Sequence, residues 1–399
     1  MLTTNRSLFL SLPFFLAACG NQTMAPVETD RIVIENDESI LNQRVQVLEN
    51  VSVELSRSNS TSTIKPSPKH TIQQATKLAA GKMRLMLRAE VPPPTLEGHR
   101  LYATHVTFDK KHAYVSYSTK NDAYRGGVEI FDINHIRRPK LRSQALFLDT
   151  DITIARQNEN RLFLGEATDS DQNDDFATPA CLEVIHLRSG VITRKTTRVD
   201  LPSFNANDVA CFDETVFVTA GTTDGRLIIF QNHGTNISKT IAIPGAKAVK
   251  KHRDYVLVLE GTGTRLHLVN RTTCAFVKTI DLGCTNDFQG KAEMDVDGDR
   301  VYISAGSCGM LALDLASETV VTTIPAPDNG VTNGVSVTNG FVFLANGTDG
   351  LQVAQMTDSG CDILGSARFE GSTNFVAADG EVVFVANGLG GLKILEIVR

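Results

Sequence analysis

The sequence predicts an all-β fold, a seven-bladed β-propeller with four-stranded blades, over residues 82–399. Three observations predict it: the chain repeats itself seven times, each copy has the length of one blade, and apolar residues alternate with polar ones between Asp, Asn and Gly turns. A two-residue period with frequent turns is typical of strands. Repeats of about 40–45 residues with four strands each are typical of propeller blades.

The clearest copies of the repeat lie near the C-terminus. Residues Val335–Met356 and Val376–Ile397 align without a gap. The same frame fits five more copies, two of them with longer turns, which begin at Ala113, Arg161, Val209, Val249 and Met294. The matching core positions, expected to be buried, are spaced by 49, 54, 40, 45, 41 and 41 residues and are Tyr114, Phe163, Phe217, Leu257, Tyr302, Phe343 and Phe384.

The last copy ends at Arg399, directly after its third predicted strand. The fourth strand of that blade must then come from elsewhere in the chain. Residues 82–90 precede the first copy and place Met83, Leu85 and Leu87 on one side of an extended chain. We therefore expect residues 82–90 to supply the closing strand of the ring.

The first eighteen residues have the layout of a secretory signal peptide. Arg6 precedes an apolar run from Leu8 to Ala18, which is shorter than the roughly 20 residues of a membrane span. Leu16-Ala17-Ala18-Cys19 resembles the lipobox of bacterial lipoproteins, in which the cysteine is lipidated and becomes the first residue. The resemblance implies an acyl anchor of the palmitate type on Cys19. The alternative is an ordinary signal peptide followed by a chance cysteine.

Residues 19–81 are predicted to be the lipidated N-terminus and a spacer. A helix is expected around Glu38–Leu55, and the Ser, Thr and Pro residues of 57–71 are typical of a flexible linker. A further short helix or strand is expected between Ile72 and Ala89. The domain organisation is therefore 1–18 signal peptide, 19–81 spacer and 82–399 propeller.

Composition excludes some classes of partner and leaves the cysteines open. The net charge of −6 gives no basic face for nucleic acid, and the 42% hydrophobic content is sufficient for a core. Six cysteines besides Cys19 permit up to three disulfides with fifteen pairings. Reduced cysteines buried as small hydrophobic side chains are the alternative.

Two acidic stretches are weak candidates for calcium, and no other cofactor is predicted. Asp169, Asp171 and Asn173 have the alternate spacing of an oxygen-ligand loop, but the sixth and twelfth positions of a calcium loop are not matched. A solvated acidic loop is the favoured interpretation. Asp295–Asp299 also has alternate carboxylates, but it falls on a hairpin of the repeat, where the preference of turns for Asp and Gly explains these residues without a metal.

The position two residues before each first-strand anchor is expected to line the mouth of the central channel. These positions are Thr104, Thr153, Asn207, Lys247, Ala292, Asn333 and Asn374, and His105, Asp208 and Glu293 are immediate neighbours. Such a polar ring could bind a sugar, a peptide or ordered water. The alternative is that the Asn residues cap strand-entry turns in each blade.

Several copies end in a pattern that resembles a known family. Gly127–Ile133 reads GVEIFDI, and GLQVAQM and GLKILEI follow aromatic strands that end in Ala-Asn-Gly. These segments are similar to LVIVD-repeat proteins, which are exported bacterial propellers. The resemblance covers about residues 95–399 and implies the fold and an exported setting, with no established enzymatic activity.

These observations favour a lipid-anchored cell-envelope propeller that acts as a binding scaffold for a protein or glycan. The resemblance to bacterial lipoproteins implies that an Asp after the cysteine would favour the inner membrane, so Gly20 favours the outer membrane of a Gram-negative bacterium. The alternative is a periplasmic or surface hydrolase or lyase that uses residues lining the channel. No nucleic-acid partner is expected, catalytic residues are unknown, and the oligomeric state is left open.

Overall fold

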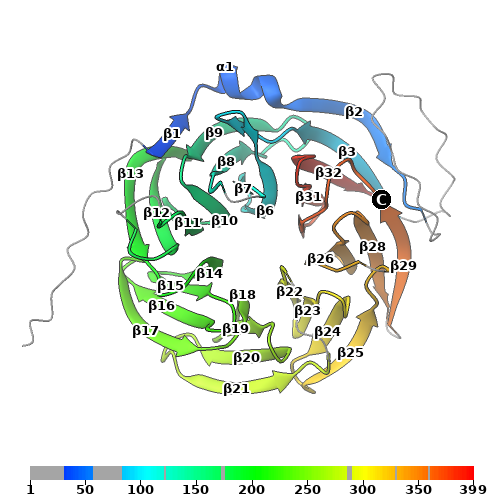
Figure 1. Ribbon diagram of the computed structural model, residues 1–399. Helices are drawn as coiled ribbons and strands as arrows, with labels where there is room; N and C mark the ends of the chain where they lie inside the picture. Colours follow the sequence, from blue (N-terminus) through cyan, green and yellow to red (C-terminus); the bar gives the residue numbers. More distant parts are fainter. Residues whose placement is uncertain are drawn as a thin grey trace, which may run out of the picture.

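The computed structural model describes residues 31–56, 83–120, 123–171, 176–284, 290–328, 330–357 and 360–399. They form seven antiparallel sheets arranged in a ring, which confirms the predicted seven-bladed β-propeller (Figure 1). No helix in these ranges is long and apolar enough to cross a membrane. The predicted signal peptide, Cys19 and Asn173 lie outside the described residues.

Blades 2 to 6 have their four strands in sequence order from the channel outward, whereas blades 1 and 7 also take outer strands from the N-terminal part of the chain. The strands of blades 1 to 3 are β6 (Tyr102–Phe108), β7 (His112–Ser118), β8 (Gly126–Asp132), β9 (Lys140–Phe147); β10 (Thr150–Asn158), β11 (Arg161–Thr168), β12 (Ala180–Arg188), β13 (Val191–Asp200); and β14 (Ala206–Phe212), β15 (Thr215–Ala220), β16 (Arg226–Gln231), β17 (Asn236–Ala242). Those of blades 4 and 5 are β18 (Ala246–His252), β19 (Tyr255–Glu260), β20 (Arg265–Asn270), β21 (Phe276–Asp281); and β22 (Met294–Asp297), β23 (Arg300–Ser304), β24 (Met310–Asp314), β25 (Thr319–Ile324). Blade 6 contains β26 (Gly334–Thr338), β27 (Phe341–Ala345), β28 (Leu351–Thr357) and β29 (Gly360–Ala367), and blade 7 contains β30 (Phe375–Asp379), β31 (Val382–Ala386) and β32 (Leu392–Val398).

The hydrophobic core lies between neighbouring blades. All seven predicted core positions, one on the second strand of each blade, are at most 3% exposed. Phe163 of blade 2, for example, packs in one cluster with Val209 and Phe230 of blade 3. Because each sheet covers the next, both faces of a blade are apolar, which explains the buried patterns of the second and third strands.

The glycine that opens the third strand is required by close packing in the last three blades. A Cβ at Gly309, Gly350 or Gly391 would lie 2.0–2.2 Å from the carbonyl oxygen of Ile324, Ala367 or Val91, on the neighbouring fourth strand. All three glycines also have positive φ, which other residues rarely adopt. The repeated glycine of the sequence motif is therefore a structural feature of the blade.

The fourth strand of blade 7 comes from the N-terminal side of the propeller. β3 (Arg84–Val91) pairs antiparallel with β32, with Leu85 opposite Ile397 and Leu87 opposite Leu395. Residues 82–90, expected from the sequence to close the ring, therefore include most of this strand. Met83, Leu85 and Leu87 are buried in the core shared with blade 6.

Residues 31–56 wrap around the outside of the ring and form what we call the N-terminal strap (Figure 1). β1 (Ile32–Glu35) adds a fifth strand to blade 1, and β2 (Gln46–Val53) adds one to blade 7. Ser56 then forms a backbone bridge with Ser366 of blade 6. Part of the segment expected to be a spacer therefore packs on the propeller.

The helix expected around Glu38–Leu55 is shorter than predicted. α1 covers Glu38–Leu41, with Asp37 as its N-cap, and a 3-10 turn (η2) covers Asn42–Arg44. The rest of the expected range is strand β2, because its valines have high β propensity and the edge of β3 offers unpaired backbone groups.

Two arginines of the strap neutralise carboxylates that are fully buried in the propeller. Arg31 pairs with Glu183 of blade 2 and lies 3.4 Å from Asp149. Arg44 pairs with Glu129 of blade 1. Since Glu129 and Glu183 have no exposed side-chain surface, they depend on the strap for their counterions, and the strap therefore belongs to the folded domain.

Candidate functional site

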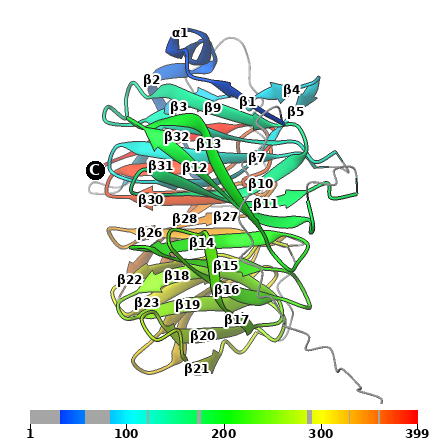
Figure 2. The same cartoon turned by 90° about the vertical axis from the view of Figure 1, so that its left-hand side faces the viewer.

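All seven inner strands begin at one face of the ring, which we call the top face; the opposite face is the bottom face. At the start of β10, Thr150 pairs with Thr168 at the end of β11, so the loops after the second strands share the top face with the loops that lead into the inner strands. The hairpin β4 (Thr95–Leu96) and β5 (His99–Arg100) projects here, directly before β6 (Figure 2). The acidic turn after β11 lies on the same face.

The seven predicted ring positions lie on or directly before the inner strands. Thr104, Thr153, Asn207 and Lys247 belong to β6, β10, β14 and β18, and Ala292, Asn333 and Asn374 precede β22, β26 and β30.

The amides of this ring join neighbouring blades. Asn207 donates through Nδ2 to the carbonyls of Gly221 and Ala246, both at 2.7 Å. Asn374 donates through Nδ2 to the carbonyl of Ala103 at 3.1 Å. These bonds favour the structural alternative for the two asparagines.

Thr104 and Lys247 are also engaged with backbone carbonyls. The Thr104 hydroxyl donates to Ser116 at 3.1 Å and more weakly to Ile152 at 3.3 Å. Lys247 Nζ donates to Gly290 at 2.9 Å. Burial lowers the pKa of Lys247. These four polar side chains of the ring therefore stabilise the top of the channel.

One layer deeper, side chains of blade 5 reach across the channel to blade 1. Lys291 Nζ donates to the carbonyl of Thr104 at 2.9 Å, and Glu293 Oε1 lies 3.6 Å from His105 Nε2. His105 also stacks on Phe375 of blade 7, with ring centroids 3.7 Å apart. His105 and Glu293, predicted as site residues, therefore meet on the axis of the ring.

Further charges surround this pair. Arg156 lies 3.5 Å from Asp208, and Lys250 lies 3.1 Å from Asp295. We call the whole set the axial cluster; it contains His105, Arg156, Asp208, Lys250, Lys291, Glu293 and Asp295. Three members of the cluster were not predicted from the sequence: Arg156 and Lys250, which each follow a ring position by three residues, and Lys291, which precedes one.

Burial makes the central pair neutral near neutral pH. Burial and the carboxylate of Asp208 raise the pKa of Glu293 to about 8. Burial, together with the charges of Lys291, Arg156 and Lys250, holds the pKa of His105 well below its usual value. The contact therefore joins an uncharged imidazole to a protonated carboxyl, and it is not an ion pair at pH 7.

Of the two calcium candidates, the first lies apart from the axial cluster. Asp169 and Asp171 lie in the turn after β11, and their third partner Asn173 is not described. Within the described ranges, no group of three His, Cys, Asp or Glu side chains could hold a metal ion. Of the second acidic stretch, Asp295 belongs to the axial cluster and Asp299 pairs with Arg253 at 2.8 Å.

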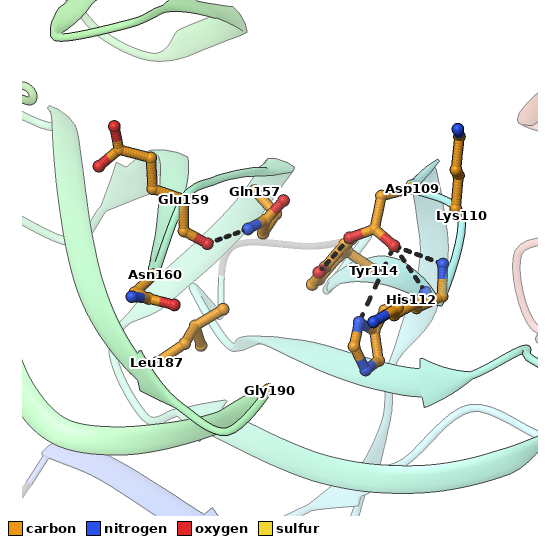
Figure 3. A pocket seen from close by; sticks show the side chains of 10 residues that line it. Asp109, Lys110, His112, Tyr114, Gln157, Glu159, Asn160, Leu187 and Gly190 are labelled. Carbon is orange, nitrogen blue, oxygen red and sulfur yellow. Dashed lines mark hydrogen bonds and ion pairs between the residues drawn. The ribbon is translucent and has the colours of Figure 1, made fainter.

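A shallow hollow on the bottom face lies between blades 1 and 2 (Figure 3). Asp109 accepts hydrogen bonds from the backbone of Lys111 at 2.6 Å and of His112 at 2.8 Å, and from the Tyr114 hydroxyl at 2.9 Å. Gly190 and Asn160 face it from blade 2 (Figure 3). Because Asp109 is already satisfied by its own turn, this hollow has little free chemistry.

One disulfide forms where the sequence permitted up to three. Cys284 and Cys308 join the loop before β22 to the loop after β23, both on the top face. The other described cysteines are free thiols, namely Cys181, Cys211, Cys274 and Cys361. Cys181 is buried and donates to Glu166 Oε2 at 2.9 Å, and burial raises its pKa, so it behaves as a core side chain.

Comparison with known proteins identifies the fold. No family model matches the chain, and no curated protein matches it. The structure of U3-55K matches with a TM-score of 0.58 and 10% identity over 79% of this chain and 99% of that chain. The RRP9 WD40 repeats match with a TM-score of 0.56 and 10% identity over 80% of this chain and 98% of that one. At such identity the likeness shows the fold alone, and the chain is a β-propeller repeat protein.

Proposed function

We propose that the protein is a lipid-anchored cell-envelope scaffold that binds a protein or glycan partner on the top face of its propeller. The family implied by the repeats, LVIVD-repeat proteins, is consistent with this function. The WD40-like architecture also supports it, because a rigid ring presents loops from seven blades on one surface.

The observation that carries the proposal is an exposed aromatic side chain on that face. Phe204, in the loop between β13 and β14, is 67% exposed, more than any other large hydrophobic side chain in the part of the chain that the structure describes. Full burial of a Phe side chain contributes about 1.5–3 kcal/mol. Aromatic residues in such positions are enriched at protein interfaces.

The experiment compares two exposed phenylalanines. A Cys19→Ala protein is immobilised, and detergent-solubilised envelope is passed over it, with bound proteins and glycans identified by mass spectrometry. Phe204→Ser should lose the partner, whereas Phe276→Ser, at a 49% exposed position on the outer rim, should retain it. Identical partners on both variants would contradict a top-face site.

The envelope location rests on Cys19. Arg31 begins the strap at the top end of β9, where it accepts from the backbone of Leu148. Twelve residues (31 minus 19) span at most about 43 Å, so a lipid on Cys19 would keep the rim of blades 1 and 2 near the membrane. Labelled palmitate should be incorporated into the wild-type protein and not into Cys19→Ala. An unlabelled wild-type protein would refute the anchor, and separate fractionation of the two Gram-negative membranes tests the outer-membrane assignment.

The axial cluster supports a second candidate, a hydrolase or lyase that acts through the channel. A protonated Glu293 beside a neutral His105 could serve as a general acid and a general base. Hydrolysis or elimination of envelope glycans would then be abolished in both Glu293→Gln and His105→Asn. Activity that survives both substitutions would exclude this use of the cluster.

A further inference from the structure

The charges on the axis of the propeller do not balance. With Glu293 protonated, three cations, Arg156, Lys250 and Lys291, face two carboxylates in the cluster. The charges of all three cations lower the pKa of His105. The cluster therefore carries an excess positive charge. Because its side chains are largely shielded from water, this charge would interact strongly with a bound anion.

The two ionised carboxylates are already committed to the backbone. Asp208 accepts from the N–H groups of Val209 at 2.8 Å and Val249 at 2.9 Å. Asp295 accepts from the N–H groups of Val296 at 3.0 Å and Val337 at 2.9 Å. These carboxylates hold inner strands together, and each shares only one oxygen with its neighbouring cation.

Polar groups of the cluster remain unsatisfied. His105 is 2% exposed, and neither ring nitrogen has a hydrogen-bond partner among the described residues. The Nε–H of Arg156 is buried without a partner in the same part of the chain. Buried polar atoms without partners are uncommon in folded proteins, and these three are available to hydrogen-bond a polar ligand.

The cations border the channel. The side chains of Arg156 and Lys250 are 27% and 35% exposed, and they stand on the inner strands of blades 2 and 4. A carboxylate offers two coplanar oxygens, which match the guanidinium fork and leave room for an ammonium or imidazole donor. A single excess charge also matches a monoanion better than a multiply charged group.

We propose that the axial cluster is a carboxylate-binding site, in which Arg156, Lys250 and Lys291 hold the anion beside His105. The carboxylate accepts from the His105 imidazole N–H. A small organic acid and the C-terminal carboxylate of a peptide present the same chemistry.

The test follows the imidazole directly. A Cys19→Ala protein labelled with ¹⁵N-histidine is titrated with sodium acetate against sodium chloride at equal ionic strength, and His105→Asn assigns the signal. Acetate should shift the His105 resonances saturably and chloride should not. No saturable shift, or an equal shift with chloride, would overturn the proposal.

Variants test which cations bind. Arg156→Gln and Lys291→Gln should each weaken acetate binding by about tenfold or more, because each removes a charge-assisted hydrogen bond. Lys195→Gln, an exposed lysine on β13, is the matched control and should bind as the wild type. Full affinity in both cluster variants, with unchanged circular dichroism, would refute the site.

Two further titrations separate the sources of the carboxylate. Triglycine and its C-terminal amide differ only in the carboxylate, so binding of triglycine alone supports a chain terminus, and binding of acetate alone supports a small acid. The site does not depend on the proposed partner surface: Phe204→Ser should titrate like the wild type even if it loses the partner.

The pH dependence has a definite sign. Glu293 faces Asp208, Lys291, Lys250, Arg156 and His105. Below its pKa of about 8 it is neutral, and above it the new carboxylate repels the ligand. Acetate affinity should therefore fall between pH 7 and pH 9.5. Burial lowers the pKa of Lys291, so loss of the Lys291 charge would also weaken acetate binding as pH rises. Glu293→Gln should therefore reduce, without abolishing, the fall in acetate affinity. An unchanged fall in this variant would assign the pH dependence to Lys291 and contradict the role of Glu293.

Discussion

The contact between Arg44 of the strap and Glu129 of blade 1 allows a quantitative test of how the strap stabilises the ring. Glu129 is fully buried and accepts from the Tyr117 hydroxyl and the Gln144 amide, both at 2.6 Å. Arg44 supplies its ion pair and also donates to the carbonyl of Pro92. Arg44→Met would leave the carboxylate with neutral donors alone.

The expected loss is large because one charge of a buried pair would remain uncompensated. Removing one partner of such a pair costs about 3–5 kcal/mol. With an unfolding entropy of about 2.1 cal/mol/K per residue over roughly 330 residues, this corresponds to a fall in Tm of about 4–7 °C. Arg44→Met combined with Glu129→Gln should recover much of it, since no buried charge then remains.

Differential scanning calorimetry of the Cys19→Ala protein gives the measurement, with urea unfolding as a check. The control is Arg142→Met, because Arg142 joins blade 1 to Glu38 of the strap through a partly exposed pair at 3.4 Å. Exposed pairs contribute about 0–1 kcal/mol, so its Tm should fall by less than about 2 °C. Equal effects of Arg44→Met and Arg142→Met, or no recovery in the double variant, would refute the reasoning.

Three other predictions concern stability. Deletion of residues 82–90 should lower the melting temperature sharply, because it removes β3 from the edge of blade 7; an unchanged melting curve would contradict closure by this strand. Cys284→Ser with Cys308→Ser should lower the free energy of unfolding by about 3 kcal/mol, since the disulfide closes a loop with a sequence separation of 24; urea unfolding measures it. The raised pKa of Glu293 means that the folded state holds a proton that the unfolded state has lost, so wild-type stability should fall as pH rises from about 4.5 to about 8. Glu293→Gln should flatten this dependence of Tm on pH, and an equal slope in both proteins would count against a buried, protonated Glu293.

The blades could be predicted because their constraints are local and repeated. Phe343 and Phe384 occupy the same frame 41 residues apart, and both are fully buried. The strap could not be predicted in the same way. β2 has apolar and polar residues on a half-exposed edge, and it becomes a strand because β3 offers it a partner, which is a tertiary effect that propensity does not contain.

The candidate site was predicted in part. The repeat frame placed His105 and Glu293 beside the channel, and the structure brings them together. The repeat frame could not show that the side chains of Asn207 and Asn374 donate hydrogen bonds to carbonyls of the next blade, because an inter-blade hydrogen bond depends on the twist between two sheets. Nor could the repeat frame identify Arg156, because this single basic residue on one blade becomes part of a charged cluster only together with charged side chains from three other blades.

The strap also determines how an anchor would act on the propeller. Arg31 directly precedes β1, and Arg44 is the last residue of η2, which follows α1. Each neutralises a buried carboxylate, so detaching the strap from the ring would leave two carboxylates without a counterion. A pull on the chain before Arg31 is therefore resisted by blades 1 and 2 together. The propeller would remain closed under such a pull, and the top face, where β1 begins, would keep a fixed relation to the tether. A binding surface that carries Phe204 on this face would then be presented at a constant distance range from the membrane, which is a property that a scaffold requires and a freely diffusing enzyme does not.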